Sequence, residues 1–347
     1  MKRTRMFPLL LSTIIAFALV FAAYLYWTED ESLEDFSGNY RDQFAAMSIE
    51  EVLEHIPGSL PILQYHMIMT PRNAIILKPF LKKHRGASRY VVTTEEFRRE
   101  ITILYNKGFR PISLDEYLSL GSGAASSLKR LAPDTKPFVL TFDDATYGQV
   151  DFVDTNSDGI LELDPDCALG VLIDFHRQHP DFALTGAFCI EFSKPPFFQP
   201  SYVEKKLNLL LDYGFEIVNH TKNHRSLSKL WAHSPEKVNE EIGGAMEKFE
   251  SYLGYRAKSI NKIAYPNGHV LPKLKDAMKE IHYNGKTYRF VAALHAFGLQ
   301  APHPRSARFD PYLIPRIEMS SNNFEKFVLL APRLLTLPPL LSTEQHD

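Results

Sequence analysis

The chain has 347 residues, of which 45% are hydrophobic and 23% are charged, so it can bury one sizeable core and is not a long disordered segment. Its net charge of −2 provides no basic field for nucleic acid, and no nucleic-acid partner is expected. Two cysteines are too few for a disulfide framework. We expect Cys167 and Cys189 to be buried free thiols that pack as small apolar residues.

The N-terminus predicts a membrane anchor. Lys2-Arg-Thr-Arg5 precedes an apolar stretch of about twenty residues, 6–27, which is long enough to cross a bilayer with its positive end inside. We therefore expect residues 1–28 to be a single-pass transmembrane signal anchor in a bacterial cell membrane, with the rest of the chain outside the cytoplasm. A cleaved signal peptide, which would leave a secreted protein, is the alternative, because Ala16-Phe-Ala18 is typical of a cleavage site.

The remainder of the chain predicts an α/β fold. Residues 29–59 are polar and acidic and are expected to form an extracytoplasmic spacer. Residues 72–88 are basic and are expected to form an irregular loop beside the candidate site described below. Expected strands lie at 61–65, 136–142, 183–190, 215–219, 259–264 and 290–294, and expected helices at 94–105, 113–118, 165–179, 202–213, 234–253 and 272–280. Strands that alternate with helices predict a largely parallel sheet covered by helices.

Two adjacent carboxylates follow one of these strands. Lys136-Pro-Phe-Val-Leu-Thr-Phe142 is β-branched and aromatic, as a buried strand is, and it ends in Asp143 and Asp144. Neighbouring strand residues face opposite ways, so the two aspartates cannot play the same part. One of them can ligate a metal ion while the other accepts a proton.

Two histidines follow another strand. His220-Thr-Lys-Asn-His224 comes directly after the apolar run 215–219, and two imidazoles at this spacing can converge on one ion. With a carboxylate they form the donor set of a catalytic divalent metal that keeps open positions. Alone, an Asp-Asp pair is typical of a solvated turn, and a His-x-x-x-His match is a common coincidence. Their joint occurrence at strand ends, where α/β proteins place their chemistry, favours a metal site.

A third polar stretch resembles the first half of a calcium-binding loop, with oxygen donors at alternate positions and a glycine for the sharp turn. Its candidate ligands are Asp154, Asn156, Asp158, Glu162 and Asp164. The twelfth position, which needs a bidentate glutamate, is Pro165, and no helix is expected before the loop. Calcium binding and a polar surface excursion are therefore both open.

The two metal-type stretches resemble the first two motifs of the NodB-homology polysaccharide deacetylases, carbohydrate esterases that remove N-acetyl groups. Ala264-Tyr-Pro-Asn-Gly268 resembles their third motif, with a small residue where many members carry arginine. Leu63-Gln-Tyr-His66 resembles the opening strand of the branch that acts on poly-N-acetylglucosamine. The resemblance covers residues 60–317 and implies a distorted (β/α) barrel of about seven parallel strands over 60–318, followed by a C-terminal tail, 319–347.

The resemblance also implies roles for single residues. Asp143 is the expected general base, and His66 is the expected general acid, in place of the family's late Leu-x-His motif. Leu294-His295 also lies at a strand end. The expected ligands of a zinc ion, or of nickel, cobalt or iron, are Asp144, His220 and His224.

Two positions depart from the family pattern. Ala145 replaces the glycine that usually follows the aspartates, which is expected to tilt the turn, and Ala264 replaces the arginine that often orients the base. Candidate residues of the substrate groove are Tyr265, Pro266, Tyr147 and Trp231. For the aromatic members of this group, burial in the core is the alternative to stacking on a sugar.

These features predict a metal-dependent hydrolase that removes N-acetyl groups from an N-acetylglucosamine-containing polysaccharide of the cell surface. One alternative is a catalytically inactive surface protein that binds carbohydrate, which Ala145, Ala264 and the added calcium-type loop suggest. Another is an amidase that acts on a different C–N bond, because fold alone does not determine the substrate.

Overall fold

The computed structural model describes residues 59–122, 131–132, 135–154, 160–268, 270–296, 300–320 and 324. The expected anchor over 1–28, the spacer apart from its last residue and most of the C-terminal tail lie outside this part of the chain, so they stay predictions. No helix within the described residues combines the length and the apolar composition that a bilayer span needs.

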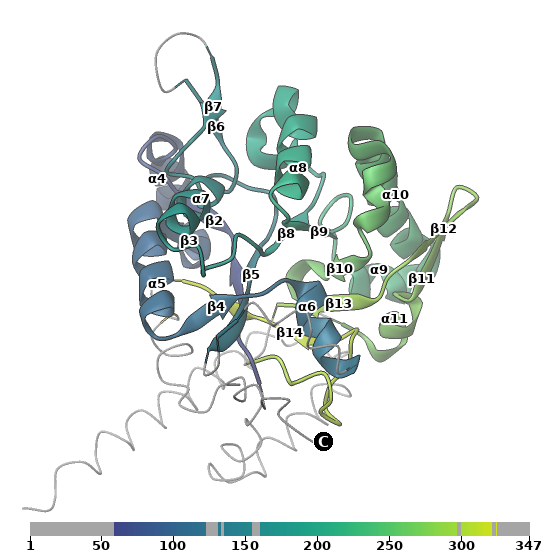
Figure 1. The fold of residues 1–347 in the computed structure, drawn as a ribbon. Helices are drawn as coiled ribbons and strands as arrows, with labels where there is room; N and C mark the ends of the chain where they lie inside the picture. Colours follow the sequence, from purple (N-terminus) through teal and green to yellow (C-terminus); the bar gives the residue numbers. More distant parts are fainter. Residues whose placement is uncertain are drawn as a thin grey trace, which may run out of the picture. The chain divides into compact units, whose positions relative to one another are not determined.

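Parallel strands in one row form the centre of the described structure (Figure 1). The row runs β14-β13-β10-β9-β8-β5-β1-β15, and each neighbouring pair is parallel. The bounds are β1 Ile62–Tyr65, β5 Lys136–Phe142, β8 Ala187–Ile190, β9 Glu216–Asn219, β10 Lys262–Ala264, β13 Ala292–His295, β14 Ile314–Pro315 and β15 Ile317–Glu318. A short strand, β4 (Phe109–Pro111), pairs with the start of β5.

The two ends of this row are joined by a single residue. β14 pairs with β13 and β15 pairs with β1, yet only Arg316 separates β14 from β15 in the chain. This one extended segment therefore lies between both edges and nearly closes the sheet into a barrel. If β14 and β15 are counted as halves of one strand, the described row has seven members, and the expected barrel of about seven parallel strands is confirmed.

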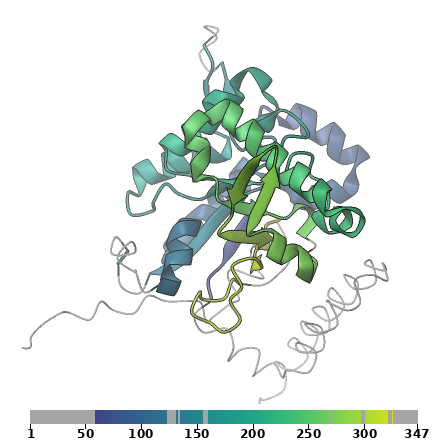
Figure 2. The same cartoon turned by 90° about the vertical axis from the view of Figure 1, so that its right-hand side faces the viewer.

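Helices cover the outside of the barrel, as Figures 1 and 2 show. They are α4 Ala74–Lys83, α5 Thr94–Asn106, α6 Leu114–Ser119, α7 Ala168–Gln178, α8 Val203–Asp212, α9 Leu227–His233, α10 Pro235–Leu253 and α11 Pro272–Ala277. Local sequence determines several of their ends. α5 begins with a capping box in which Thr93 accepts from the Glu96 amide, so the helix starts at Thr94, as expected. Gly108, at φ +82°, ends the turn that follows.

Three short pairs of strands lie outside the barrel. They are β2 (Met67–Met69) with β3 (Val91–Thr93), β6 (Phe152–Val153) with β7 (Glu162–Leu163), and β11 (Glu280–Tyr283) with β12 (Lys286–Arg289). The helix expected over 272–280 ends at Ala277, and Glu280 instead begins the β11–β12 hairpin. Asn284 and Gly285 form the tip of this hairpin at positive φ, and this Asn-Gly pair is the turn signal that the sequence reading did not use.

The prediction of an irregular loop over 72–88 was wrong. Residues Ala74–Lys83 form the helix α4, and Arg85–Tyr90 form a 3-10 helix. Thr70 and Asn73 hold the turn before α4 through reciprocal hydrogen bonds between their side chains and backbone amides. Pro79 within the helix removes one backbone hydrogen bond, which is why the stretch does not resemble a helix in sequence.

Alternation along the strands divides the core into two clusters. Leu63, Tyr65, Leu140 and Phe142 belong to the large cluster that includes apolar residues of the covering helices. Their neighbours, such as Val139, belong to a second cluster in which small residues are frequent, including Ala187, Cys189, Ala264 and Ala292. The period of two thus assigns the second set to the barrel interior. Both cysteines are buried and free, as expected.

One buried carboxyl in the large core gives a testable pH dependence. Glu100 on α5 is fully buried and accepts a hydrogen bond from the Tyr65 hydroxyl at 2.7 Å. Burial raises the pKa of Glu100 from 4.5 to about 7, against the lowering effect of the Tyr65 hydrogen bond. The folded state therefore holds the proton more tightly than the unfolded state, so this group stabilises the fold below pH 4.5 and the contribution is lost as the pH rises to about 7.

We expect the free energy of unfolding, measured with urea, to fall between pH 5 and pH 8 by an amount on the order of 3 kcal/mol from this group. Glu100→Gln removes the titration and should flatten the profile over that window. Glu95→Gln changes an exposed residue of the same helix and serves as the control. Equal pH slopes in Glu100→Gln and the wild type would contradict the assignment.

Candidate metal centre and active site

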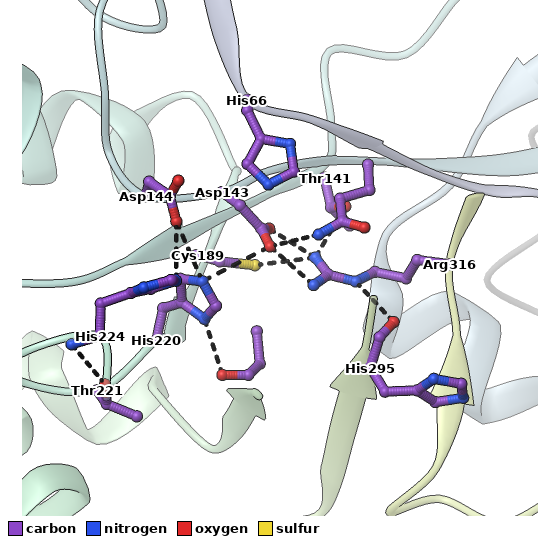
Figure 3. A network of polar contacts seen from close by, with 12 residues as sticks. His66, Thr141, Asp143, Asp144, Cys189, His220, Thr221, His224, His295 and Arg316 are labelled. Atoms are coloured by element: carbon purple, nitrogen blue, oxygen red, sulfur yellow. Dashed lines mark hydrogen bonds and ion pairs between the residues drawn. The ribbon is translucent and has the colours of Figure 1, made fainter. Parts of the chain in front are cut away.

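The carboxyl ends of three barrel strands carry the candidate residues. Asp143 and Asp144 directly follow β5, His220 directly follows β9, and His66 directly follows β1. These strands are parallel, so their ends meet at one edge of the barrel. Figure 3 shows the five side chains, including His224, grouped there. The sequence reading had named each of them.

Asp144, His220 and His224 converge as a metal site would. Asp144 Oδ1 lies 3.3 Å from His220 Nε2 and 3.3 Å from His224 Nε2, and the three ligand atoms lie within 4.8 Å of one another. Two atoms bound about 2.1 Å from one tetrahedral zinc ion are about 3.4 Å apart. Apart from these imidazoles, the buried Asp144 Oδ1 has no partner among the described residues. The donor set therefore fits a divalent ion.

The orientation of His220 is determined by the backbone. Its Nδ1 lies 2.8 Å from the Ala264 carbonyl oxygen. A carbonyl only accepts hydrogen bonds, so Nδ1 must donate and Nε2 keeps its lone pair directed toward Asp144. Burial favours a raised pKa for Asp144, but hydrogen bonding from His220 and His224 holds it well below its ordinary value. The carboxylate is thus ionised, as a metal ligand must be.

The loops that present these ligands adopt the left-handed backbone region. Asp144, Ala145, Thr221 and His224 have φ values of 71°, 45°, 72° and 52°. Such values favour glycine, and a run of other residues in this region is typical of functional sites. Ala145 therefore forms the tight turn itself, while its buried methyl group packs in the large core.

Asp143 is clamped by a residue that the sequence reading missed. Arg316 Nη1 lies 2.6 Å from Asp143 Oδ1 and Arg316 Nη2 lies 2.8 Å from Oδ2, a bidentate pair with both side chains buried (Figure 3). Gln64 Nε2 donates to Oδ2 at 2.7 Å. Burial alone would raise the pKa of Asp143, but Arg316, His220 and His66 hold it below its ordinary value. Asp143 is consequently ionised.

Arg316 occupies the barrel interior between β14 and β15. Its Nη1 also donates to Thr141 Oγ1 at 3.2 Å, and its Nε lies 3.4 Å from the His295 carbonyl oxygen. Ala264 carries no guanidinium. Arg316, between β14 and β15, supplies the guanidinium that Asp143 would otherwise lack. An arginine inside the apolar strand segment Ile314–Ile317 was the available signal in the sequence.

The two candidate proton donors differ in position. The His66 ring lies in the site above the two aspartates, packs against Tyr90 with ring centroids 4.9 Å apart, and has a buried Nδ1 without a described partner (Figure 3). The His295 ring points away from Asp143, and only its carbonyl contacts the site. Burial and Arg316 lower the pKa of His295 to about 4. His66 is therefore the better placed of the two.

The candidate groove residues separate into core and surface. Tyr265 is 1% exposed, belongs to the large core and donates its hydroxyl to the Tyr312 carbonyl, and Pro266 is also buried, so neither offers a face to a sugar. The inclusion of these two residues is corrected accordingly. Trp231 is partly buried against the same core. Tyr147 is partly exposed and stacks on Phe198 with centroids 4.0 Å apart, so it stays a groove candidate.

The calcium-type loop is only partly described. Asn156 and Asp158 lie outside the described residues. Asp154 directly follows β6, and Glu162 is the first residue of β7. Asp164 is buried at the hairpin base, where its Oδ1 accepts from the Asp166 amide. Calcium binding at these five positions stays a prediction.

The comparisons with known proteins address the family. Residues 181–285 match the family model described as polysaccharide deacetylase, a range that includes His220, His224 and the third motif. Residues 181–285 are therefore similar in sequence to the polysaccharide deacetylase family. The resemblance to the NodB-homology group is thereby confirmed. A search of the curated proteins found no match.

Solved structures extend the deacetylase fold over most of the chain. The deacetylase PplD of Streptococcus pyogenes, in complex with acetate, is 18% identical, with a TM-score of 0.52 over 79% of this chain and 97% of that one. Polysaccharide deacetylases from Bacillus cereus and Bacillus anthracis are 18% and 16% identical, with TM-scores of 0.53 and 0.51, over 79% of this chain and 69% of each of theirs. At these identities the likeness shows the fold.

The clamp on Asp143 predicts a large effect on stability. Arg316→Met leaves a buried carboxylate without its cation, and we expect the free energy of unfolding to fall by about 3–5 kcal/mol. Arg256→Met breaks the more exposed pair with Asp212, 2.8 Å long, and should cost less than about 1 kcal/mol. Urea unfolding measures both. In the double variant Arg316→Met/Asp143→Asn much of the loss should be recovered, and a purely additive loss would contradict the pairing.

The convergence of the three ligands predicts a binding phenotype. We expect the wild type to bind one zinc ion at this site, and His224→Ala to weaken the affinity by at least about 10- to 100-fold, the loss typical even of outer partners of a ligand. His282→Ala changes an exposed histidine on β11 and is the control. Competition with a chromogenic chelator gives the dissociation constants. Unchanged affinity in His224→Ala would remove this residue from the ligand set.

Proposed function

We propose that this protein is a metal-dependent hydrolase that removes N-acetyl groups from an N-acetylglucosamine-containing polysaccharide of the cell surface. The observation that carries the proposal is the ionised Asp143, held by Arg316 at the edge of a three-ligand metal site. One Asp143 oxygen, Oδ2, lies 3.7 Å from His220 Nε2 and so faces the position of the ion. The family match and the shared fold support the class of reaction.

The ligands Asp144, His220 and His224 would hold the ion, for which we propose zinc, with nickel, cobalt and iron compatible with the same donors. When bound there, such an ion would supply Lewis-acid polarisation of an amide carbonyl and would lower the pKa of a water beside it to about 7. Asp143 Oδ2 then accepts the proton of the attacking water. The lowered pKa of Asp143 keeps its carboxylate ionised at neutral pH, so it is free to accept a proton.

His66 is proposed to deliver the proton that the leaving amine requires. Its ring lies over the aspartates, and its buried Nδ1 has no partner among the described residues. Gln149 links the chain segment after β1 to the segment after β5. Its Nε2 donates to the carbonyl oxygens of His66 and Asp143 at 2.8 and 2.6 Å. The proton donor and the base are thus positioned by one side chain.

The alternative of an inactive carbohydrate-binding protein loses two of the three features that suggested it. Ala145 adopts the left-handed turn that the position requires, and Arg316 supplies the guanidinium that Ala264 cannot. An amidase that acts on another C–N bond would use the same residues, so the substrate must be determined by assay. We also propose that the chain is anchored through residues 1–28, with this domain outside the cytoplasm.

The decisive test is acetate release from poly-N-acetylglucosamine and from peptidoglycan, with zinc present and after chelation. We expect release that chelation stops and zinc restores. Asp143→Asn should lower turnover by at least about 100-fold, the lower range for a lost general base, while zinc stays bound. Asp276→Asn, at an exposed carboxylate of α11, is the control for a lost carboxylate. Retained turnover in Asp143→Asn would remove it from the base role, and metal-loaded protein that releases no acetate from either glycan would overturn the proposal.

A further inference from the structure

The helix α4 exposes an unusual amount of apolar surface. Ile75, Ile76 and Phe80 are 79%, 53% and 42% exposed, and they are three of the seven large hydrophobic residues that the described chain exposes. Leu77 is the one α4 residue that is buried. The helix therefore rests on the barrel through a narrow contact, and it lies at the periphery in both Figure 1 and Figure 2. Clustered exposed apolar residues of this kind mark an interaction surface.

The same segment is strongly basic. Between Thr70 and Thr94 the chain has no aspartate or glutamate, although the whole protein carries a net charge of −2. Its cations are Arg72, Lys78, Lys82, Lys83, Arg85 and Arg89. Arg72 lies 3.9 Å from Asp164, and Arg89 contacts the Tyr90 hydroxyl and ring. The other four are exposed and form no ion pair with the described residues. An anionic partner would complement them.

The helix arranges these two features as an interfacial helix does. At roughly 100° per residue, Ile75, Ile76, Pro79 and Phe80 fall within an arc of about 140° on one face. Lys83 lies on the same face one turn further, and Lys78 and Lys82 border it, whereas the buried Leu77 points the opposite way. An apolar face bordered by lysines lies in the plane of a bilayer surface, with its apolar side chains among the acyl chains and its ammonium groups at the phosphates.

We propose that α4 docks on an anionic phospholipid surface, with Ile75, Ile76 and Phe80 inserted and the lysines at the lipid phosphates. An anionic bilayer supplies both an apolar phase and negative charge, whereas a neutral glycan does not supply this combination. The ten-residue helix lies on the membrane and does not cross it. This inference does not depend on the deacetylase proposal.

Docking through α4 would also place the active site at the membrane. The segment that contains α4 begins at Met67, directly after His66, and returns at Tyr90, whose ring packs on the His66 ring 4.9 Å away. The rim of the site at His66 and Tyr90 and the lipid-facing helix α4 therefore belong to one continuous segment, residues 66–90. This last consequence alone rests on the proposed function, under which the acetamides within reach would be those of glycan close to the bilayer.

The test uses the full chain and one fluorescent probe. Both native cysteines are fully buried, so Ile76→Cys can be labelled selectively with an environment-sensitive fluorophore. Val291→Cys, at a 48% exposed position against 53% for Ile76, is the matched control. The labelled proteins are mixed with vesicles of phosphatidylglycerol and phosphatidylcholine, or of phosphatidylcholine alone, each with and without a lipid-borne quencher.

We expect a blue shift and at least about threefold stronger quenching at Ile76 than at Val291, only with phosphatidylglycerol, and reduced by high salt. Lys78→Glu/Lys82→Glu/Lys83→Glu in the Ile76→Cys chain should abolish the difference. Lys107→Glu/Lys258→Glu/Lys273→Glu changes the net charge equally at exposed lysines elsewhere and should preserve it. Equal quenching at both probes would overturn the proposal. A shift at Ile76 that needs no vesicles would also overturn it, and would point to self-association if it rose with protein concentration, or to the glycan if it required that polymer.

Discussion

The bidentate pair between Arg316 and Asp143 is the interaction on which the site depends. A guanidinium in the barrel interior is acceptable only if a carboxylate neutralises it and other acceptors take its remaining hydrogens. Asp143, Thr141 and the His295 carbonyl do so. The small residues of the interior cluster leave the space that this large side chain occupies. The same contacts hold the Asp143 carboxylate beside His220, one of the candidate metal ligands, so the packing of the barrel and the geometry of the site have one cause.

Much of this architecture is readable from the sequence, because its signals are local. The strand that ends in Asp143 was predicted over its full length, since a β-branched and aromatic run bounded by proline has few other interpretations. The spacing of His220 and His224 predicts a pair of metal ligands, and the structure directs both Nε2 atoms at Asp144. Helices with a serine cap, such as the one after Ser113, were predicted to within one residue.

What sequence reasoning missed depends on contacts between distant segments. Arg316 and Asp143 are 173 positions apart, and only the closure of the barrel brings them together. Gln64 is likewise a polar residue in an apolar strand whose partner cannot be inferred without the register of β1 and β5. Tyr265 follows a motif that suggests a groove, yet its ring points into the core. The helix α4 was hidden by Pro79 and by the charge of its surroundings.

The position of Arg316 between the two closing strands also has a consequence for how the protein matures. The first barrel strand, β1, obtains one of its neighbours only from β15, close to the end of the described chain. Pairing across that sequence separation is entropically costly and forms late in folding. Until it forms, the carboxylate of Asp143 has no guanidinium and the barrel has two open edges. A nascent or truncated chain that stops before residue 316 would thus carry Asp144, His220 and His224 and still lack the clamp on Asp143, so under the proposed mechanism hydrolytic competence would arrive only when the barrel closes.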